Sequence, residues 1–145
     1  MDNVAIGISP DMRLSQTQKH QVRAALDQVG LSDKLASYPR DLSGGQQGRV
    51  GLARVLLRQR PLLLLDEPFS ALGPALKDEM LDLLSQILHV TSATALMLTH
   101  DPKDALAFAN QAILVADGVA MAPQPIQQLF DAPPPALRAY LGHRT

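Results

Sequence analysis

The chain has 145 residues, 46% of them hydrophobic, and is therefore long enough to bury the core of one ordinary domain. A formal net charge of −1 and an aromatic content of 3% argue against a nucleic-acid-binding surface, and the lack of cysteine excludes disulfides and thiolate metal sites. No apolar run reaches the ~20 residues that span a bilayer, and the start has no positively charged leader, so a soluble cytosolic chain is expected.

The first forty residues predict helices. Apolar residues at helical spacing follow Ser15, which forms a potential capping box with Gln18, and Gly30 stands where such a helix commonly ends. A shorter helical piece is expected over 33–37, because a residue that precedes a proline such as Pro39 is pushed out of the helical region.

A Ser-Gly-Gly-Gln sequence opens the next predicted helix, which runs from about Ser43 to Gln59. Its apolar residues recur on one face: Val50, Ala53 and Leu57. A capping box explains Ser43 and Gln46 but not Gly44 and Gly45, each of which costs a helix up to ~1 kcal/mol. Backbone N–H groups beside a hydroxyl at a positive helix end form a phosphate seat, which would give the glycines a reason. The four residues alone are weak support for that interpretation.

Four consecutive leucines between Pro61 and Pro68 predict a strand that is buried on both faces of a parallel sheet. The strand would deliver Asp66 and Glu67 to its carboxyl end, which is where open α/β sheets bind ligands. Asp66 can hold Mg²⁺, usually through its waters, and Glu67 can orient or deprotonate a water that attacks a phosphoryl group. An ordinary polar exit from a strand into a turn explains the same two residues equally well.

The next elements are expected to continue the α/β pattern. Pro74 can begin a helix whose buried face comprises Leu76, Met80, Leu83, Leu84, Ile87 and Leu88. A second buried strand over 93–98 ends just before His100, and Asp101 is a plausible N-cap for a helix over 103–109. His100 alone is equally compatible with a structural turn.

The last part of the chain predicts a hairpin followed by two short helices. Asp117-Gly118 is a strong signal for a two-residue turn. The segments expected around and after it are strands at 112–116 and 119–121 and helices at 126–130 and 136–141.

These motifs together resemble the nucleotide-binding subunit of ATP-binding-cassette (ABC) transporters. The signature motif at 42–46, the Walker B strand at 61–68 and the switch histidine, His100, follow in the family's order and spacing, with a D-loop comprising Ser70, Ala71, Leu72 and Gly73. The resemblance covers essentially the whole chain. It implies an α/β fold, a partial P-loop NTPase (ABC ATPase) fold with parallel strands, flanking helices and a helical signature subdomain. Residues 1–59 would be that subdomain, incomplete, and 60–145 the C-terminal part of the ATPase core.

The resemblance also implies the roles of individual residues. Asp66 would coordinate Mg²⁺, Glu67 would polarise the attacking water and His100 would contact the γ-phosphate. The residues expected to bind the γ-phosphate of ATP held by the opposite subunit are Ser43, Gly44, Gly45 and Gln46. The implied cofactors are ATP and Mg²⁺. The implied partners are a second ATPase subunit in a head-to-tail homodimer and transmembrane permease subunits, with no nucleic acid. The implied location is peripheral, on the inner face of the cell membrane.

Three features depart from the family pattern. The sequence has no Gly-Lys dipeptide and so no P-loop, and a chain of this kind looks like the carboxyl-terminal part of a longer subunit. Alone, it is expected neither to bind ATP with useful affinity nor to hydrolyse it. Gln47 and Gly48 replace the family's usual Arg-Gln pair, whereas Arg49 matches it. Gly73 replaces the D-loop aspartate, which in the family helps to link the two nucleotide sites.

Several stretches are similar to the ATPase subunits of thiamine importers within this family, including 64–81 and 115–118. The sequence is also compatible with related importers that transport metals, polyamines or molybdate. The alternative function is a non-catalytic remnant or interaction module that can at most offer its signature helix to an intact partner. DNA-repair ATPases of the same superfamily are disfavoured, because the chain lacks a basic surface and coiled-coil heptads.

Overall fold

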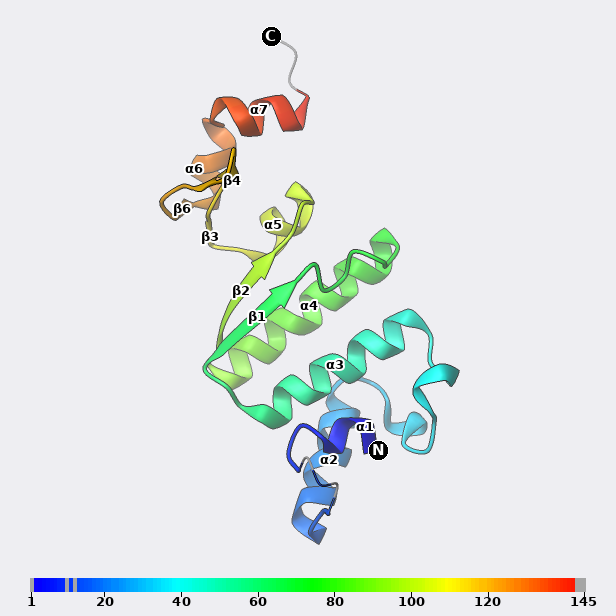
Figure 1. The fold of residues 1–145 in the computed structure, drawn as a ribbon. Coiled ribbons are helices and arrows are strands. Elements are labelled where there is room, and N and C mark those ends of the chain that lie inside the picture. Colours follow the sequence, from blue (N-terminus) through cyan, green and yellow to red (C-terminus); the bar gives the residue numbers. More distant parts are fainter. Residues whose placement is uncertain (1, 10, 12, 143–145) are drawn as a thin grey trace. The chain divides into compact units, whose positions relative to one another are not determined.

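The computed structural model describes residues 2–9, 11 and 13–142. The chain forms two compact units, Met1–Thr99 and His100–Thr145, each with its own helices and strands (Figure 1). The division expected from the family, 1–59 and 60–145, stays a prediction, and its residues 1, 10, 12 and 143–145 lie outside the described part. Among the described residues, no helix has the length and apolar character needed to cross a membrane.

The first unit begins with helices that pack around α3. Their bounds are α1 Asp2–Ala5, α2 Gln16–Gln28, η1 Ser32–Lys34, η2 Pro39–Asp41 and α3 Gly44–Arg58. The capping box predicted at Ser15 and Gln18 starts α2, and the left-handed Gly30 (φ 71°) follows its end, as predicted. The short helical piece expected over 33–37 is a 3₁₀ turn that begins one residue earlier.

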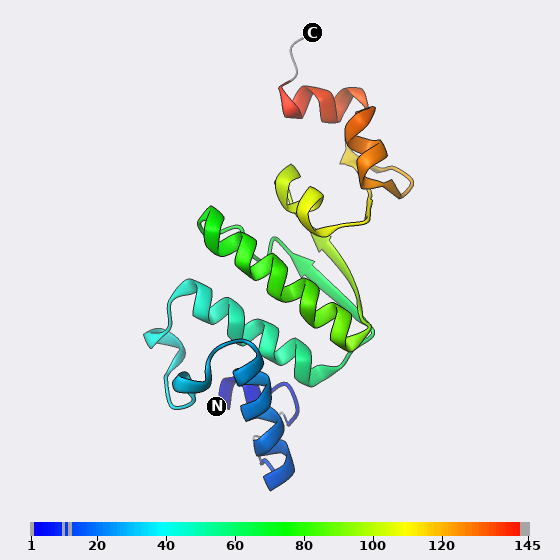
Figure 2. The same ribbon diagram turned by 180° about the vertical axis from the view of Figure 1, so that it is seen from behind.

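Helix α3 lies between α2 and α4 (Pro74–Thr91), and the core of the first unit forms along these contacts (Figures 1 and 2). Leu52 and Ala53 are its buried apolar residues. The predicted stripe is therefore only partly right, because Val50 and Leu57 are half-buried. A helix with neighbours on two sides buries residues outside a single stripe, which local spacing does not reveal.

Strands β1 (Leu62–Asp66) and β2 (Thr94–Leu98) pair with each other in parallel. Helix α4 connects them along the chain and lies along one face of the pair (Figures 1 and 2). Leu63 is buried. The prediction that both strands are buried on both faces is wrong in this structure, since Leu64 is 70% and Leu96 48% exposed. These two leucines are register partners, so alternation places both on the same, uncovered face.

The second unit contains α5 and two small antiparallel pairs followed by two helices. The bounds are α5 Pro102–Phe108, β3 Gln111–Ala112, β4 Val115–Ala116, β5 Val119–Ala120, β6 Gln124–Pro125, α6 Ile126–Asp131 and α7 Pro135–Leu141. Asp101 caps α5 by accepting from the Lys103 N–H at 3.0 Å, as predicted. The predicted hairpin forms between β4 and β5, with positive φ at Asp117 (51°) and Gly118 (76°).

Candidate functional site

The helix tip at the start of α3 forms the predicted capping box. Ser43 has extended backbone (φ −64°, ψ 161°), and its hydroxyl accepts from the Gln46 N–H at 3.3 Å. In return, the Gln46 side-chain oxygen accepts from the Ser43 N–H at 3.0 Å. Two of the donors at this helix end are thereby satisfied, and the tip has a defined shape.

The amides of Gly44 and Gly45 are the next donors, and the helix itself provides no acceptor for them. Ser43 and Gly44 are exposed, whereas Gly45 is buried against α4. A Cβ on Gly45 would lie 2.6 Å from Leu76 Cδ2, so a larger residue there would force the Leu76 side chain to move, and close packing favours a glycine. Packing is thus a reason for Gly45 that the sequence did not reveal, whereas Gly44, whose added Cβ would lie 3.8 Å from the nearest side chain, has no such packing reason.

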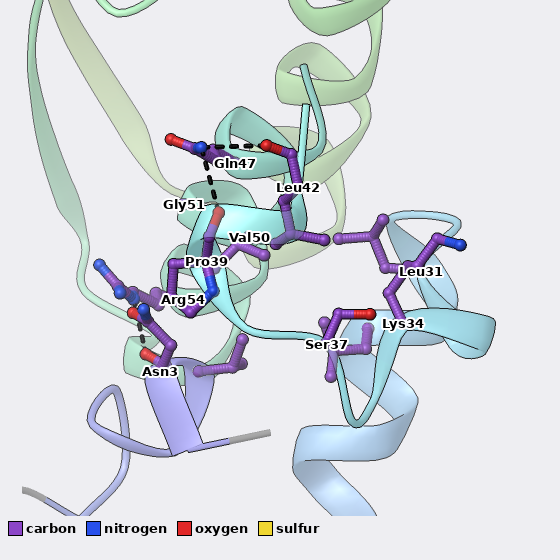
Figure 3. A pocket seen from close by; sticks show the side chains of 12 residues that line it. Asn3, Leu31, Lys34, Ser37, Pro39, Leu42, Gln47, Val50, Gly51 and Arg54 are labelled. Atoms are coloured by element: carbon purple, nitrogen blue, oxygen red, sulfur yellow. Dashed lines mark hydrogen bonds between the residues drawn. The ribbon is translucent and has the colours of Figure 1, made fainter. Parts of the chain in front are cut away.

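Gln47 holds the loop that leads to the tip, a role that sequence reasoning missed. Its side-chain Nε2 donates to the Pro39 carbonyl at 3.2 Å and to the Leu42 carbonyl at 3.1 Å (Figure 3). No sequence pattern connects a glutamine with a carbonyl eight residues earlier. A residue that departs from the family's usual one therefore has a structural use here.

The two adjacent carboxylates leave the carboxyl end of β1, as predicted. Asp66 is the last residue of the strand, and Glu67 follows with a left-handed backbone (φ 42°). Both are exposed. A non-glycine residue in this region costs roughly 1–2 kcal/mol, and such residues cluster at functional sites.

Hydrogen bonds on both sides hold the backbone of Glu67. Its N–H donates to the Leu98 carbonyl at 3.0 Å, which ties it to the end of β2. Its carbonyl accepts from the Ser70 hydroxyl at 3.1 Å and from the Ser70 N–H at 3.3 Å. Phe69, buried, anchors the turn between them. The predicted D-loop serine thus fixes the predicted catalytic glutamate from within the same turn.

The rest of the predicted D-loop leads into α4. The Leu72 N–H donates to the Phe69 carbonyl at 3.1 Å, and Ala71 is exposed. Gly73 is the N-cap of α4, with extended backbone (φ −68°, ψ 158°) and no side chain to accept a hydrogen bond. A Cβ at this position would meet no atom within 4 Å, so the position has room for a larger residue.

His100 is the first residue of the second unit and is described within it. It is exposed, and its carbonyl accepts from the Tyr140 hydroxyl at 2.6 Å. This bond joins α7 to the residue that precedes the N-cap of α5. Sequence reasoning missed Tyr140, because forty residues separate the two partners.

A cavity of about 220 Å³ lies in the first unit, beside α3 (Figure 3). None of the predicted site residues lines it. Its polar groups are largely committed to the protein: Gln47 bonds to the loop, and Arg54 Nε donates to the Asn3 carbonyl at 2.8 Å. The residues between them include Val50 and Gly51.

Comparison with known proteins adds the following findings. A family model described as ABC transporter matches residues 2–70. The thiamine import ATP-binding protein ThiQ of Cereibacter sphaeroides is 60% identical over 141 residues, which are 97% of this chain and 61% of that protein. The protein of the same name from Ruegeria sp. is 51% identical, over 97% of this chain and 61% of its own length. The chain thus spans about three fifths of the length of these curated relatives.

Among solved structures, a transporter described as an ABC transporter of the metal-chelate type, in an inward-facing conformation, matches with a TM-score of 0.79 and 27% identity. The match covers 97% of this chain and 57% of that one.

Proposed function

We propose that this chain belongs to the ABC transporter family of ATP-binding subunits and forms part of the ATP-hydrolysing subunit of a bacterial importer. The observation that carries the proposal is the exposed carboxylate pair at the end of β1, with Glu67 held in a left-handed conformation. Transport would couple ATP hydrolysis on the inner face of the membrane to movement through permease subunits.

Asp66 is proposed to hold the magnesium ion. Within the described residues, no group of three or more His, Cys, Asp or Glu side chains could hold a metal ion. One exposed carboxylate nevertheless fits Mg²⁺, which keeps several waters and takes further ligands from substrate phosphates. When bound, the ion would neutralise charge on the phosphate oxygens.

Glu67 is proposed to orient the attacking water and accept its proton, and His100 to contact the γ-phosphate. Phosphoryl transfer depends mostly on positioning and on charge stabilisation. The N–H and the carbonyl of Glu67 are both hydrogen-bonded, so its backbone is fixed. A fixed backbone suits a side chain that has to position a water.

The tip of α3 is proposed to bind the γ-phosphate of ATP held by a second copy of the subunit. Its support is a helix end at which Ser43, with its hydroxyl, and Gly44 are exposed, with the buried Gly45 next to them. The Ser43 hydroxyl accepts from Gln46 and still has its own proton to donate to a phosphate oxygen. Because each nucleotide would then contact residues of both copies, we propose a head-to-tail homodimer.

The test uses a chimera in which this chain replaces the matching 141 residues of the Cereibacter sphaeroides relative. We expect magnesium-dependent ATP hydrolysis comparable to that of the parent. Glu67→Gln should lower kcat about 100-fold or more, as removal of a catalytic base does, while binding of a fluorescent ATP analogue persists. The matched control is Asp78→Asn, an exposed carboxylate on α4. A chimera without ATPase activity, or full turnover in the Glu67→Gln variant, would overturn the proposal.

Thiamine is the proposed cargo, because the relatives cited above are named as thiamine import proteins. Vesicles that contain the chimera with the relative's permease and binding subunits should take up thiamine when supplied with ATP. Uptake of a metal chelate or polyamine in its place would reject thiamine and leave the ATPase proposal intact.

A further inference from the structure

Arg49 joins three helices of the first unit. It lies in the second turn of α3, and its side chain is 20% exposed. Nη1 donates to the carbonyl of Val29, the C-cap of α2, at 2.7 Å. Nη2 forms an ion pair with Glu79 on α4. One guanidinium therefore connects the end of α2 and the side of α4 to the helix that begins at the Ser43 tip, about 9 Å of helix away.

Two glycines lie on the α3 side of the contact between α3 and α4, beside this ion pair. Gly45 faces Leu76, and Gly48 faces the Met80 side chain, whose Cε would lie 3.2 Å from an added Cβ. Glycines let the two helices approach closely but offer no side chain that would resist sliding along the axis. The Arg49–Glu79 pair supplies a directional contact at this place.

The Val29 bond fixes Arg49 from the other side. The Leu26 and Asp27 carbonyls in the last turn of α2 accept from the Leu31 and Gly30 N–H groups, and Arg49 provides the donor for the Val29 carbonyl that follows them. A cation is favourable at such a helix C-terminus. Gly30 makes room for it, because a Cβ there would lie 3.2 Å from Nη1. Two other ion pairs among the described residues of this unit, Lys34 with Asp33 and Arg40 with Asp41, join neighbours in sequence and fix no helix against another.

We propose that Arg49 is a positioning residue that fixes the axial register of α3 against α4 and so sets where the Ser43–Gln46 tip meets the nucleotide of the second copy. The inference rests on the proposed function. It concerns how the tip is placed and adds no contact between Arg49 and the nucleotide. A small displacement of a positioned group can lower turnover by up to ~100-fold without removing any catalytic group.

The test is made in the same chimera, assembled with the permease. We expect Arg49→Ala to lower kcat about tenfold or more, since the tip acts only on ATP held by the other copy, while KM for ATP stays within about twofold. Arg49→Lys keeps the charge but loses the forked guanidinium that reaches two partners, so its kcat should lie between those of the parent and Arg49→Ala. Arg58→Ala is the control, an exposed arginine on the same helix.

A double-mutant cycle separates positioning from mere packing. If Glu79 acts through Arg49, the Arg49→Ala, Glu79→Ala double variant should turn over no more slowly than Arg49→Ala alone. Losses of kcat that multiply independently would overturn the inference, as would an Arg49→Ala kcat within twofold of the Arg58→Ala value.

If Arg49→Ala fails to fold, Glu79→Gln and Arg49→Lys provide the test: a lowered kcat at constant KM supports the inference, and unchanged kcat in both variants defeats it. A parent chimera without ATPase activity would defeat the proposed function itself, which is a different result from an active parent with an unaffected variant.

Discussion

Three neighbouring residues hold the backbone of Glu67 in place. Its left-handed backbone is stabilised by the Leu98 carbonyl on one side and by Ser70 on the other. Buried Phe69 holds the turn between them in place. The energetic cost of the unusual conformation is thus offset locally, within the loop that contains the proposed catalytic residue.

Gly73 leads to a prediction at the same scale. Gly73→Asp should place a carboxylate oxygen where it can accept from the first-turn amides of α4, and Asp exceeds Gly as an N-cap by a few tenths of a kcal/mol. Hydrogen exchange of the Leu76 amide should slow. In the chimera, ATPase activity should rise, because the family uses an aspartate here to link the two nucleotide sites.

Gly73→Asn separates the two effects. Asparagine caps about as well as aspartate but carries no charge. Slower exchange in both variants with higher ATPase activity in Gly73→Asp alone would assign the gain to the charge. Unchanged activity in both would show that this position is dispensable here.

At the scale of elements, α3 shows which features follow from local sequence and which do not. The capping box at Ser43, like the hairpin at Asp117-Gly118, involves residues a few positions apart and was predictable from spacing. The bonds from Arg49 to Val29 and Glu79 span twenty and thirty residues, so no local sequence pattern predicts them. Nor does the sequence show that α4 covers only one face of the strands and leaves Leu64 exposed.

The glycines of α3 make a paired prediction about stability. Gly51→Ala should raise the free energy of unfolding by about 0.5–1 kcal/mol, because alanine favours a helix interior and the new Cβ meets no atom within 4 Å. Gly45→Ala should lower it by roughly 1 kcal/mol or more, since the methyl group would collide with Leu76.

Urea unfolding of both variants under one set of conditions provides the measurement. The two glycines differ in what surrounds them, so the two changes must differ in sign. Changes of the same sign would contradict the packing described between α3 and α4.

At the scale of the molecule, the chain carries two of the elements that the proposed reaction needs, and each is expected to act on a different nucleotide. The tip at Ser43 is expected to act on a partner's nucleotide, and the carboxylates at Asp66 and Glu67 on the nucleotide of their own copy. The order of these motifs along the sequence was enough to predict the family, because the spacing of the motifs is set by the fold. Their proposed assembly across two copies would be a property of the pair, so it cannot be derived from the structure of one chain.

The most direct test of this account is complementation between two differently tagged copies of the chimera. In one mixed dimer, Ser43→Arg stands in one copy and Glu67→Gln in the other; in the second, one copy carries both changes and its partner carries neither. If each site takes its tip from one copy and its glutamate from the other, the first dimer keeps one undamaged site and the second keeps none. We therefore predict faster ATP hydrolysis by the first dimer. Faster hydrolysis by the second would mean that a single copy holds a complete site, and would contradict the account.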